Sequence, residues 1–119
     1  MRSEPVKPAR ADFYLDLGLS KDATRTDIRK SFHALARLHH PDKKAPAQTV
    51  DAVEFRQVCA AFEVLGDEQE KANYDEDYEK IKAEWQNYRR KMRRWERWIE
   101  RERRHKEAED VAEKKDAEE

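Results

Sequence analysis

The hydrophobic and polar positions divide the chain into a lead without periodicity, a region of short helical patterns and one long helical pattern. Residues 1–11 contain two prolines and no repeating apolar position, so we expect a disordered lead. A short helix should follow, with Asp12 as its N-cap and Gly18 ending it in the left-handed conformation that glycine adopts freely. Its expected core-facing side chains are Phe13, Leu15 and Leu17.

Two longer helices are predicted next, at about 24–39 and 50–65. Thr24 and Asp27 form a variant of the capping box at the start of the first. Pro41 should end that helix, because the residue before a proline is driven out of helical geometry. The short polar connection favours antiparallel neighbours, which predicts a helical hairpin. The apolar stripes are Ile28, Phe32, Leu35, Ala36, Leu38 and His39 in the first helix and Phe55, Val58, Ala61, Phe62 and Leu65 in the second.

After Gly66 the pattern predicts a short fourth helix capped by Asp67 and then one long helix. The chain has no glycine or proline beyond residue 66. Apolar and aromatic residues are spaced alternately four and three apart, the heptad-type pattern of a coiled coil. A continuous helix over 76–106 would be roughly 45 Å long at 1.5 Å per residue, too long for a small domain to cover. The stripe is Tyr74, Tyr78, Ile81, Trp85, Tyr88, Met92, Trp95 and Ile99.

The charge distribution supports this division. Charged residues make up 45% of the chain and hydrophobic residues 37%, so the whole chain cannot form one compact core. Residues 79–106 carry 12 Lys and Arg against 5 Asp and Glu, a net charge of about +7. Residues 107–119 carry 2 against 7, about −5, and are expected to be an acidic, frayed tail. We therefore expect one small domain over 12–75, which should fold alone, followed by a charged helix.

Cysteine and histidine usage argues against several kinds of site. The single cysteine, Cys59, excludes an intrachain disulfide and a cysteine-rich zinc site. His33, His39 and His40 lack a cysteine or second carboxylate that would complete a metal site. No nucleophile with a nearby base can be identified either. We expect no metal, no cofactor and no enzymatic activity.

No apolar stretch approaches the ~20 residues needed to cross a bilayer. The N-terminus has no apolar run, so no secretory signal is visible. These observations predict a cytoplasmic or nuclear protein that does not act at a membrane.

The tripeptide His40-Pro41-Asp42 lies between the two central helices. Asp42 is an exposed acceptor suited to a bidentate arginine, and the fixed φ of Pro41 holds the loop outside the helix. The segments DFYLDLGL, IRKSFHALARLHHPDK, FRQVCAAFEVLGD and EKANYD resemble, in order and spacing, the J domain of the DnaJ-like co-chaperones. The resemblance covers residues 12–75 and implies an all-α fold, an antiparallel helical hairpin with short flanking helices. The chain lacks the Gly/Phe-rich linker and the zinc region of fuller members and so resembles the divergent class.

The resemblance also implies a partner, a DnaK-type chaperone of the heat-shock protein 70 family. In the family, the aspartate of the tripeptide meets an arginine of the chaperone and favours ATP hydrolysis. The second helix presents a basic face to an acidic patch. The implied chaperone-binding residues are His40, Pro41, Asp42, Arg25, Arg29, Lys30, Arg37, Lys43 and Lys44. His33 and Ala34 replace the usual basic pair and His39 the usual tyrosine, which should weaken electrostatic steering.

Four interpretations of the long basic helix remain open. Its stripe can pack back on the J domain or pair with another helix, including a second copy of the chain. Its arginines and tryptophans can contact RNA or a ribosome, so that the J domain recruits the chaperone to a ribonucleoprotein. It can be a solvated helix with i,i+4 ion pairs, or a nuclear localisation signal. Tryptophans on a solvated helix expose much apolar surface, so a partner is expected. The candidate contact residues are Trp85, Tyr88, Met92, Trp95, Trp98, Arg90, Arg94 and Arg101.

Overall fold

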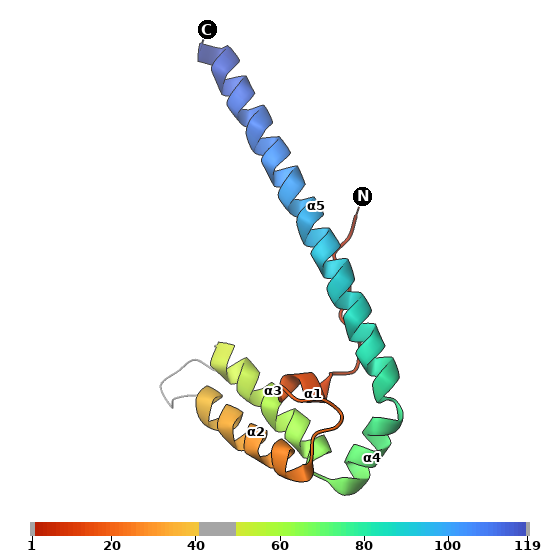
Figure 1. Cartoon of the computed structure of the whole chain (residues 1–119). Helices are drawn as coiled ribbons and strands as arrows, with labels where there is room; N and C mark the ends of the chain where they lie inside the picture. Colours follow the sequence, from red (N-terminus) through yellow and green to blue (C-terminus); the bar gives the residue numbers. More distant parts are fainter. Residues whose placement is uncertain (1, 41–49, 119) are drawn as a thin grey trace. The chain divides into compact units, whose positions relative to one another are not determined.

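A computed structural model of the chain describes residues 2–40 and 50–118 (Figure 1). Every regular element in these ranges is an α-helix, which confirms the all-α class. The helices are α1 Phe13–Asp16, α2 Arg25–His39, α3 Val50–Leu65, α4 Glu68–Glu76 and α5 Tyr78–Glu118. The chain divides into two compact units. The helical-domain unit is Arg10–Lys82, and the second unit takes in the chain before Arg10 and after Lys82.

In the helical-domain unit, α2 and α3 lie side by side and antiparallel, so the predicted helical hairpin is confirmed (Figure 1). α1 and α4 both pack against α3. The rings of Phe32 and Phe62 stack with their centroids 4.1 Å apart and join α2 to α3. The Ser31 hydroxyl donates a hydrogen bond to the Leu17 carbonyl, which connects α2 to the end of α1.

Local sequence signals set the helix ends. The Asp27 amide donates to Thr24 Oγ1 at 3.1 Å and the Thr24 amide donates to Asp27 Oδ2 at 3.0 Å, which completes the predicted capping box. Asp12 and Asp67 accept hydrogen bonds from the first turns of α1 and α4. Gly18 has a φ of +69° just after α1, the left-handed conformation expected for it. Capping residues placed by sequence therefore fix where these elements begin and end.

The core of the helical-domain unit contains the predicted Leu17 and Ile28 and also Tyr14, which the sequence analysis missed. Tyr14, Leu17 and Ile28 are fully buried, whereas Leu15 is 53% exposed and Leu38 is 70% exposed, so the predicted burial of those two leucines is wrong. The reason is helical geometry: residues three apart share a face of α1, whereas residues two apart do not.

Four polar and aromatic side chains converge where the N-terminal part of the unit meets α4 and α5. The Tyr74 hydroxyl donates to the Ala11 carbonyl at 2.6 Å and accepts from the Phe13 amide at 2.9 Å. The Tyr78 hydroxyl donates to Oδ1 of the buried Asp12 at 3.0 Å. The rings of Tyr14 and Tyr78 meet edge to face at 4.8 Å. These bonds satisfy the buried polar atoms and fasten α1 to the start of α5.

The start of the long helix differs from the prediction. The chain leaves helical geometry at Asp77, so α5 begins at Tyr78, two residues after the predicted start at 76. The Asp77 carbonyl accepts from the Ile81 amide at 3.1 Å, and its carboxylate pairs with Arg10 at 2.9 Å. Tyr78 and Ile81 are buried in the helical-domain unit. The first part of the predicted stripe is therefore core.

The end of α5 also differs from the prediction. The helix continues to Glu118, so the expected frayed tail is wrong over residues 107–118. Ion pairs one turn apart support it, including Arg103–Glu107 at 2.6 Å and His105–Glu109 at 3.1 Å. Alanine, glutamate and lysine, which favour helices, fill this segment. None of the helices in the described ranges combines the length and apolar character needed to span a membrane.

Candidate functional site

The two histidines at the end of α2 contact the start of α3. His39 Nδ1 lies 3.3 Å from Asp51 Oδ1, and the His40 ring meets the Phe55 ring edge to face at 5.3 Å. His40 has φ −56° and ψ 120°, the extended geometry that a following proline imposes. These contacts hold together the two helix ends that flank the tripeptide loop. The remaining predicted loop residues, Pro41, Asp42, Lys43 and Lys44, lie outside the described residues.

The predicted basic residues of α2 fall into two groups. Arg25, in the first turn, pairs with Glu68 of α4 at 3.2 Å and so contributes to the fold. Arg29, Lys30 and Arg37 are exposed. Arg29 and Arg37 make no ion pair within the described ranges. Lys30 and Arg37 are seven residues apart, two helical turns, and so lie on one face. That face ends at His40, beside the loop.

In the second unit, aromatic side chains follow one another along α5. The rings of Trp85 and Tyr88 meet edge to face at 5.6 Å. Met92, Trp95 and Trp98 are half-buried, whereas Ile99 is 40% exposed. The expected recognition stripe on this helix therefore begins at Trp85 rather than at the buried Ile81.

The arginines of α5 separate into unpaired and paired sets. Glu100 contacts both Arg103 and Arg104, and this pairing holds the pKa of its carboxyl below the ordinary range. The pairing between Glu100 and Arg104 follows the predicted i,i+4 pattern. Arg101 is exposed. Further toward the N-terminus, a shallow hollow is lined by basic side chains that form no ion pair within the described ranges. These are Arg90, Arg93, Arg94 and Arg97, with Asn87 and Lys91 beside them.

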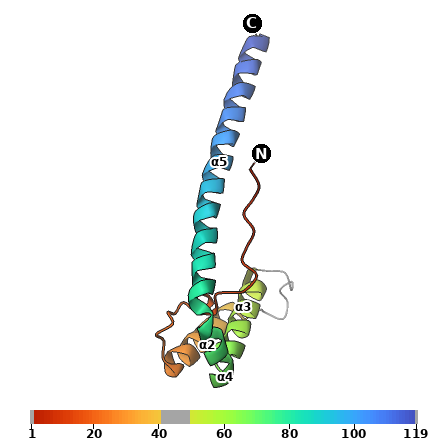
Figure 2. The ribbon, with the colours of Figure 1, turned by 90° about the vertical axis from the view of Figure 1, so that its right-hand side faces the viewer.

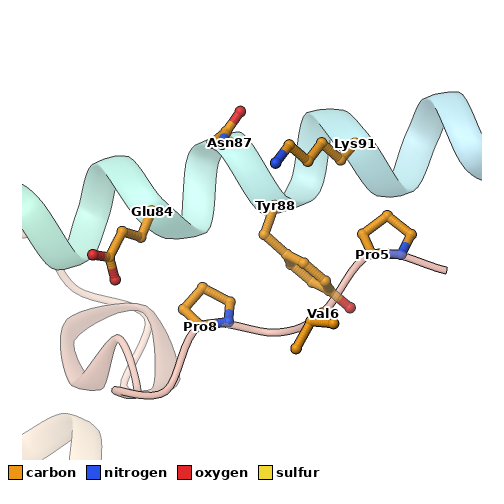
Figure 3. A pocket seen from close by; sticks show the side chains of 7 residues that line it. All are labelled: Pro5, Val6, Pro8, Glu84, Asn87, Tyr88 and Lys91. Atoms are coloured by element: carbon orange, nitrogen blue, oxygen red, sulfur yellow. The ribbon is translucent and has the colours of Figure 1, made fainter. Parts of the chain in front are cut away.

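One contact was missed by sequence reasoning. Pro5, Val6 and Pro8, from the expected disordered lead, line a pocket with Tyr88 and Lys91 of α5 (Figure 3). The two prolines three residues apart were the available signal, because that spacing matches one turn of a polyproline II helix.

Titratable groups of the helical-domain unit show the effect of burial. Burial raises the pKa of Asp16 to about 6, and the nearby carboxylates of Asp12 and Glu54 add to the shift. Burial likewise raises the pKa of Tyr74 to about 12. Among the described residues, no group of three or more His, Cys, Asp or Glu side chains is arranged to hold a metal ion.

Comparison with known proteins decides the family. The sequence model of the DnaJ domain matches residues 12–75. The chain belongs to the DnaJ domain family. The matched DnaJ domain contains α1 to α4 and the loop that carries the tripeptide. The compact unit extends beyond it at both ends, since Arg10, Tyr78 and Ile81 contribute contacts or burial.

Similar proteins match through this DnaJ domain. "Chaperone protein DnaJ" of Rickettsia bellii (strain OSU 85-389) is 45% identical over 64 residues, which are 54% of this chain and 17% of the relative. "Chaperone protein DnaJ" of Levilactobacillus brevis is 47% identical over 70 residues, 57% of this chain and 17% of the relative. "Chaperone protein DnaJ 2" of Corynebacterium efficiens is 43% identical over 75 residues, 63% of this chain and 18% of the relative. The matches therefore span less than a fifth of each relative's length.

Proposed function

We propose that this protein is a co-chaperone whose DnaJ domain stimulates ATP hydrolysis by a DnaK-type chaperone of the heat-shock protein 70 family. The observation that carries the proposal is the family match over residues 12–75, with His40-Pro41-Asp42 following α2. Relatives that share this domain are named chaperone protein DnaJ. The protein would regulate the chaperone's enzymatic step without being an enzyme.

The geometry of the hairpin supports this function in two ways. The contacts of His39 with Asp51 and of His40 with Phe55 fix the two helix ends that flank the loop in the sequence. A loop anchored at both ends loses less conformational entropy when it binds. In this proposal Asp42 accepts hydrogen bonds from an arginine of the chaperone, the strongest class of carboxylate contact.

The exposed cations of α2 would set the rate of encounter. Lys30 and Arg37 share a face, and Arg29 lies close to it, so α2 can approach an acidic surface with the loop at its end. We therefore expect association with the chaperone to be salt-dependent but slower than for a J domain with a fully basic α2.

The test is stimulation of ATP hydrolysis by a DnaK-type chaperone under single-turnover conditions, with the full chain as stimulator. Asp42→Asn removes the charge with little change of shape, so stimulation should fall at least tenfold while helicity stays the same. Asp22→Asn is the matched control, because Asp22 is an exposed carboxylate in the turn before α2. Full stimulation by Asp42→Asn would overturn the proposal.

For α5 we propose a targeting role, in which its aromatic side chains bind a partner helix or client. The half-buried Met92 and Trp95 and the partly exposed Ile99 support it, since such side chains rarely stay solvated without a partner. Residues 1–82 should then stimulate the chaperone as well as the full chain does. A loss of stimulation on removing residues 83–119 would mean that α5 activates rather than targets.

A nucleic-acid contact is the second candidate for α5, favoured by the unpaired arginines Arg90, Arg93, Arg94 and Arg97. Four adjacent cations release counterions on binding phosphates, so RNA affinity would fall steeply with salt. Reversing Arg90 and Arg94 to glutamate should abolish RNA binding under this candidate and leave a protein partner bound through Met92 and Trp95. The opposite pattern would favour the partner helix.

A further inference from the structure

The N-terminal residues run beside α5 within the second unit, a segment we call the strap, residues 2–9 (Figure 2). Residues 2–8 adopt no helix, strand or turn. Pro5 and Pro8 are half-buried, whereas Val6 is 88% exposed and Lys7 is exposed. Burial of every third residue is what a polyproline II helix gives, because it has three residues per turn. Pro5 and Pro8 therefore lie on the one face of the strap that is less exposed than the rest.

The surface that the strap contacts is one face of α5. Glu84, Tyr88, Lys91 and Trp95 are spaced four, three and four residues apart, so their side chains lie in a row along the helix. Glu84, Tyr88 and Lys91 line one pocket with Pro5, Val6 and Pro8 of the strap. Lys91 and Trp95 line a second pocket with strap residues 2–6. We call this row the strap groove. In Figure 3 the Tyr88 ring points toward the strap, between Pro5 and Pro8.

The spacing of the two strap prolines matches a spacing along the row of α5 side chains. Moving from Glu84 to Lys91 along α5 advances seven residues, roughly 10 Å at 1.5 Å per residue. Moving from Pro8 to Pro5 along a polyproline II segment covers three residues, roughly 9 Å at 3.1 Å per residue. One turn of the strap thus spans two turns of α5, so both prolines can line one pocket with Glu84, Tyr88 and Lys91. A proline-free chain of changing conformation would not hold this register.

Charge adds direction to the contact. Glu4 lines the same pocket as Lys91 and Arg94 and places a negative charge beside these cations, whereas Arg2 brings a positive charge to that pocket. The strap residues that line the two pockets with α5 include both prolines and Val6, in the same pockets as Tyr88 and Trp95. A competing segment of the same chemistry could therefore replace the strap.

We propose that the strap groove is a binding site for an extended, proline-containing segment of the form acidic-Pro-x-x-Pro, and that the strap, Glu4-Pro5-Val6-Lys7-Pro8, occupies it in cis. Prolines in the polyproline II conformation dock on aromatic surfaces at low entropic cost because they are already ordered. A segment within the same chain acts at an effective concentration in the millimolar range. An intrinsic dissociation constant of about 0.1 mM or below would therefore keep Tyr88 and Trp95 covered until a partner displaces the strap.

This inference does not rest on chaperone stimulation; it concerns access to α5. If the strap covers part of the stripe, a partner that uses Tyr88 or Trp95 must first displace it. Deleting residues 2–9 should then strengthen binding of any such partner, while the DnaJ domain functions as before.

The experiment uses the full chain and a variant lacking residues 2–9, each titrated with a synthetic peptide of sequence RSEPVKPA. The Trp95 indole resonance and the Tyr88 ring resonances report binding by NMR. The shortened chain should bind the peptide with a dissociation constant of about 0.1 mM or below. The full chain should bind it at least tenfold more weakly, because a strap at an effective concentration of about a millimolar competes with the peptide. Tyr88→Ala in the shortened chain should abolish binding, with circular dichroism as the check that α5 remains helical.

A pair of variants in the full chain tests the same point without a peptide. The double change Pro5→Ala and Pro8→Ala should move the Trp95 and Tyr88 resonances toward those of the shortened chain. Lys7→Ala is the matched control, because Lys7 is exposed and lines neither pocket; it should leave them in place.

Three results would overturn the proposal. The first is equal peptide affinity for the full and shortened chains, since the groove would then be empty in the parent. The second is no binding to the shortened chain together with unchanged resonances in the double proline variant. The third is self-association of the shortened chain without peptide binding, which would assign the groove to a second copy of α5.

Discussion

Tyr74 connects the DnaJ domain to the residues before it, so Tyr74→Phe should destabilise the domain while leaving its packing nearly unchanged. The phenylalanine ring keeps the contact with Phe13, whose centroid lies 4.9 Å from that of Tyr74. What is lost is the hydroxyl, which donates to the Ala11 carbonyl at 2.6 Å and accepts from the Phe13 amide at 2.9 Å. Two hydrogen bonds therefore disappear without a cavity.

The expected cost follows from these two bonds. A net hydrogen bond contributes about 0.5–1.5 kcal/mol, and a buried group left without a partner costs about 1–3 kcal/mol. Water can reach part of this region, because Phe13 is only half-buried. We therefore expect a loss of about 2 kcal/mol. For a domain of this size, that corresponds to a fall in Tm of about 8–16 °C.

Thermal and urea unfolding followed by circular dichroism would measure the change. Because α5 contributes much of the helical signal, near-ultraviolet signals from the tyrosines should be followed in parallel. Tyr88→Phe is the control: that hydroxyl has no hydrogen-bond partner in the part of the chain described. A Tm for Tyr74→Phe within about 2 °C of the parent would refute the reasoning, since neither bond would then contribute to stability.

Two further predictions concern the same unit. Burial raises the pKa of Asp16 from its ordinary 3.8 to about 6, so the folded state favours the protonated acid. The resulting contribution to folding stability is fully present below pH 4 and is lost as the pH rises through 6. Asp16→Asn should therefore stabilise the domain at pH 7 by about 1 kcal/mol, a modest gain because solvent screens a half-exposed group. In urea titrations this gain should vanish at pH 4. An equal gain at pH 7 and pH 4 would contradict this account. Ending the chain at residue 75 removes the buried Tyr78 and Ile81, so residues 12–75 should be less stable than residues 10–82 by about 4 kcal/mol or more, with equal stability refuting the larger unit.

Much of the DnaJ domain could be predicted because its signals are local. Thr24, Asp27 and Asp67 cap helices through bonds to residues two or three positions away, and Gly18 ends α1 through its own backbone conformation. Such interactions need no knowledge of the rest of the fold. The stripes of α2 and α3 also follow directly from helical periodicity.

The errors arose where distant segments decide the outcome. Burial of Tyr14 depends on Tyr74 and Tyr78, which lie about sixty residues further along the chain. The end of α4 at Asp77 similarly accompanies its ion pair with Arg10. No local pattern reveals these pairings, so the sequence analysis started the long helix at 76, whereas α5 starts at Tyr78. The tripeptide loop itself could be identified from sequence, and its functional assignment remains a proposal.

A heptad stripe records the geometry of a helix and not the identity of what covers it. The single series from Tyr74 to Ile99 looked like one recognition surface, yet its first three members are buried in the core of the helical-domain unit. Tyr88 and Trp95 line pockets with the strap, whose prolines have their own three-residue period. Two different periods, 3.5 on the helix and 3 on the strap, meet at these side chains. A partner for the helix is indicated by a match between the two repeat lengths, and not by the number of apolar positions. In this chain the strap, residues 2–9, is a segment whose proline spacing fits α5.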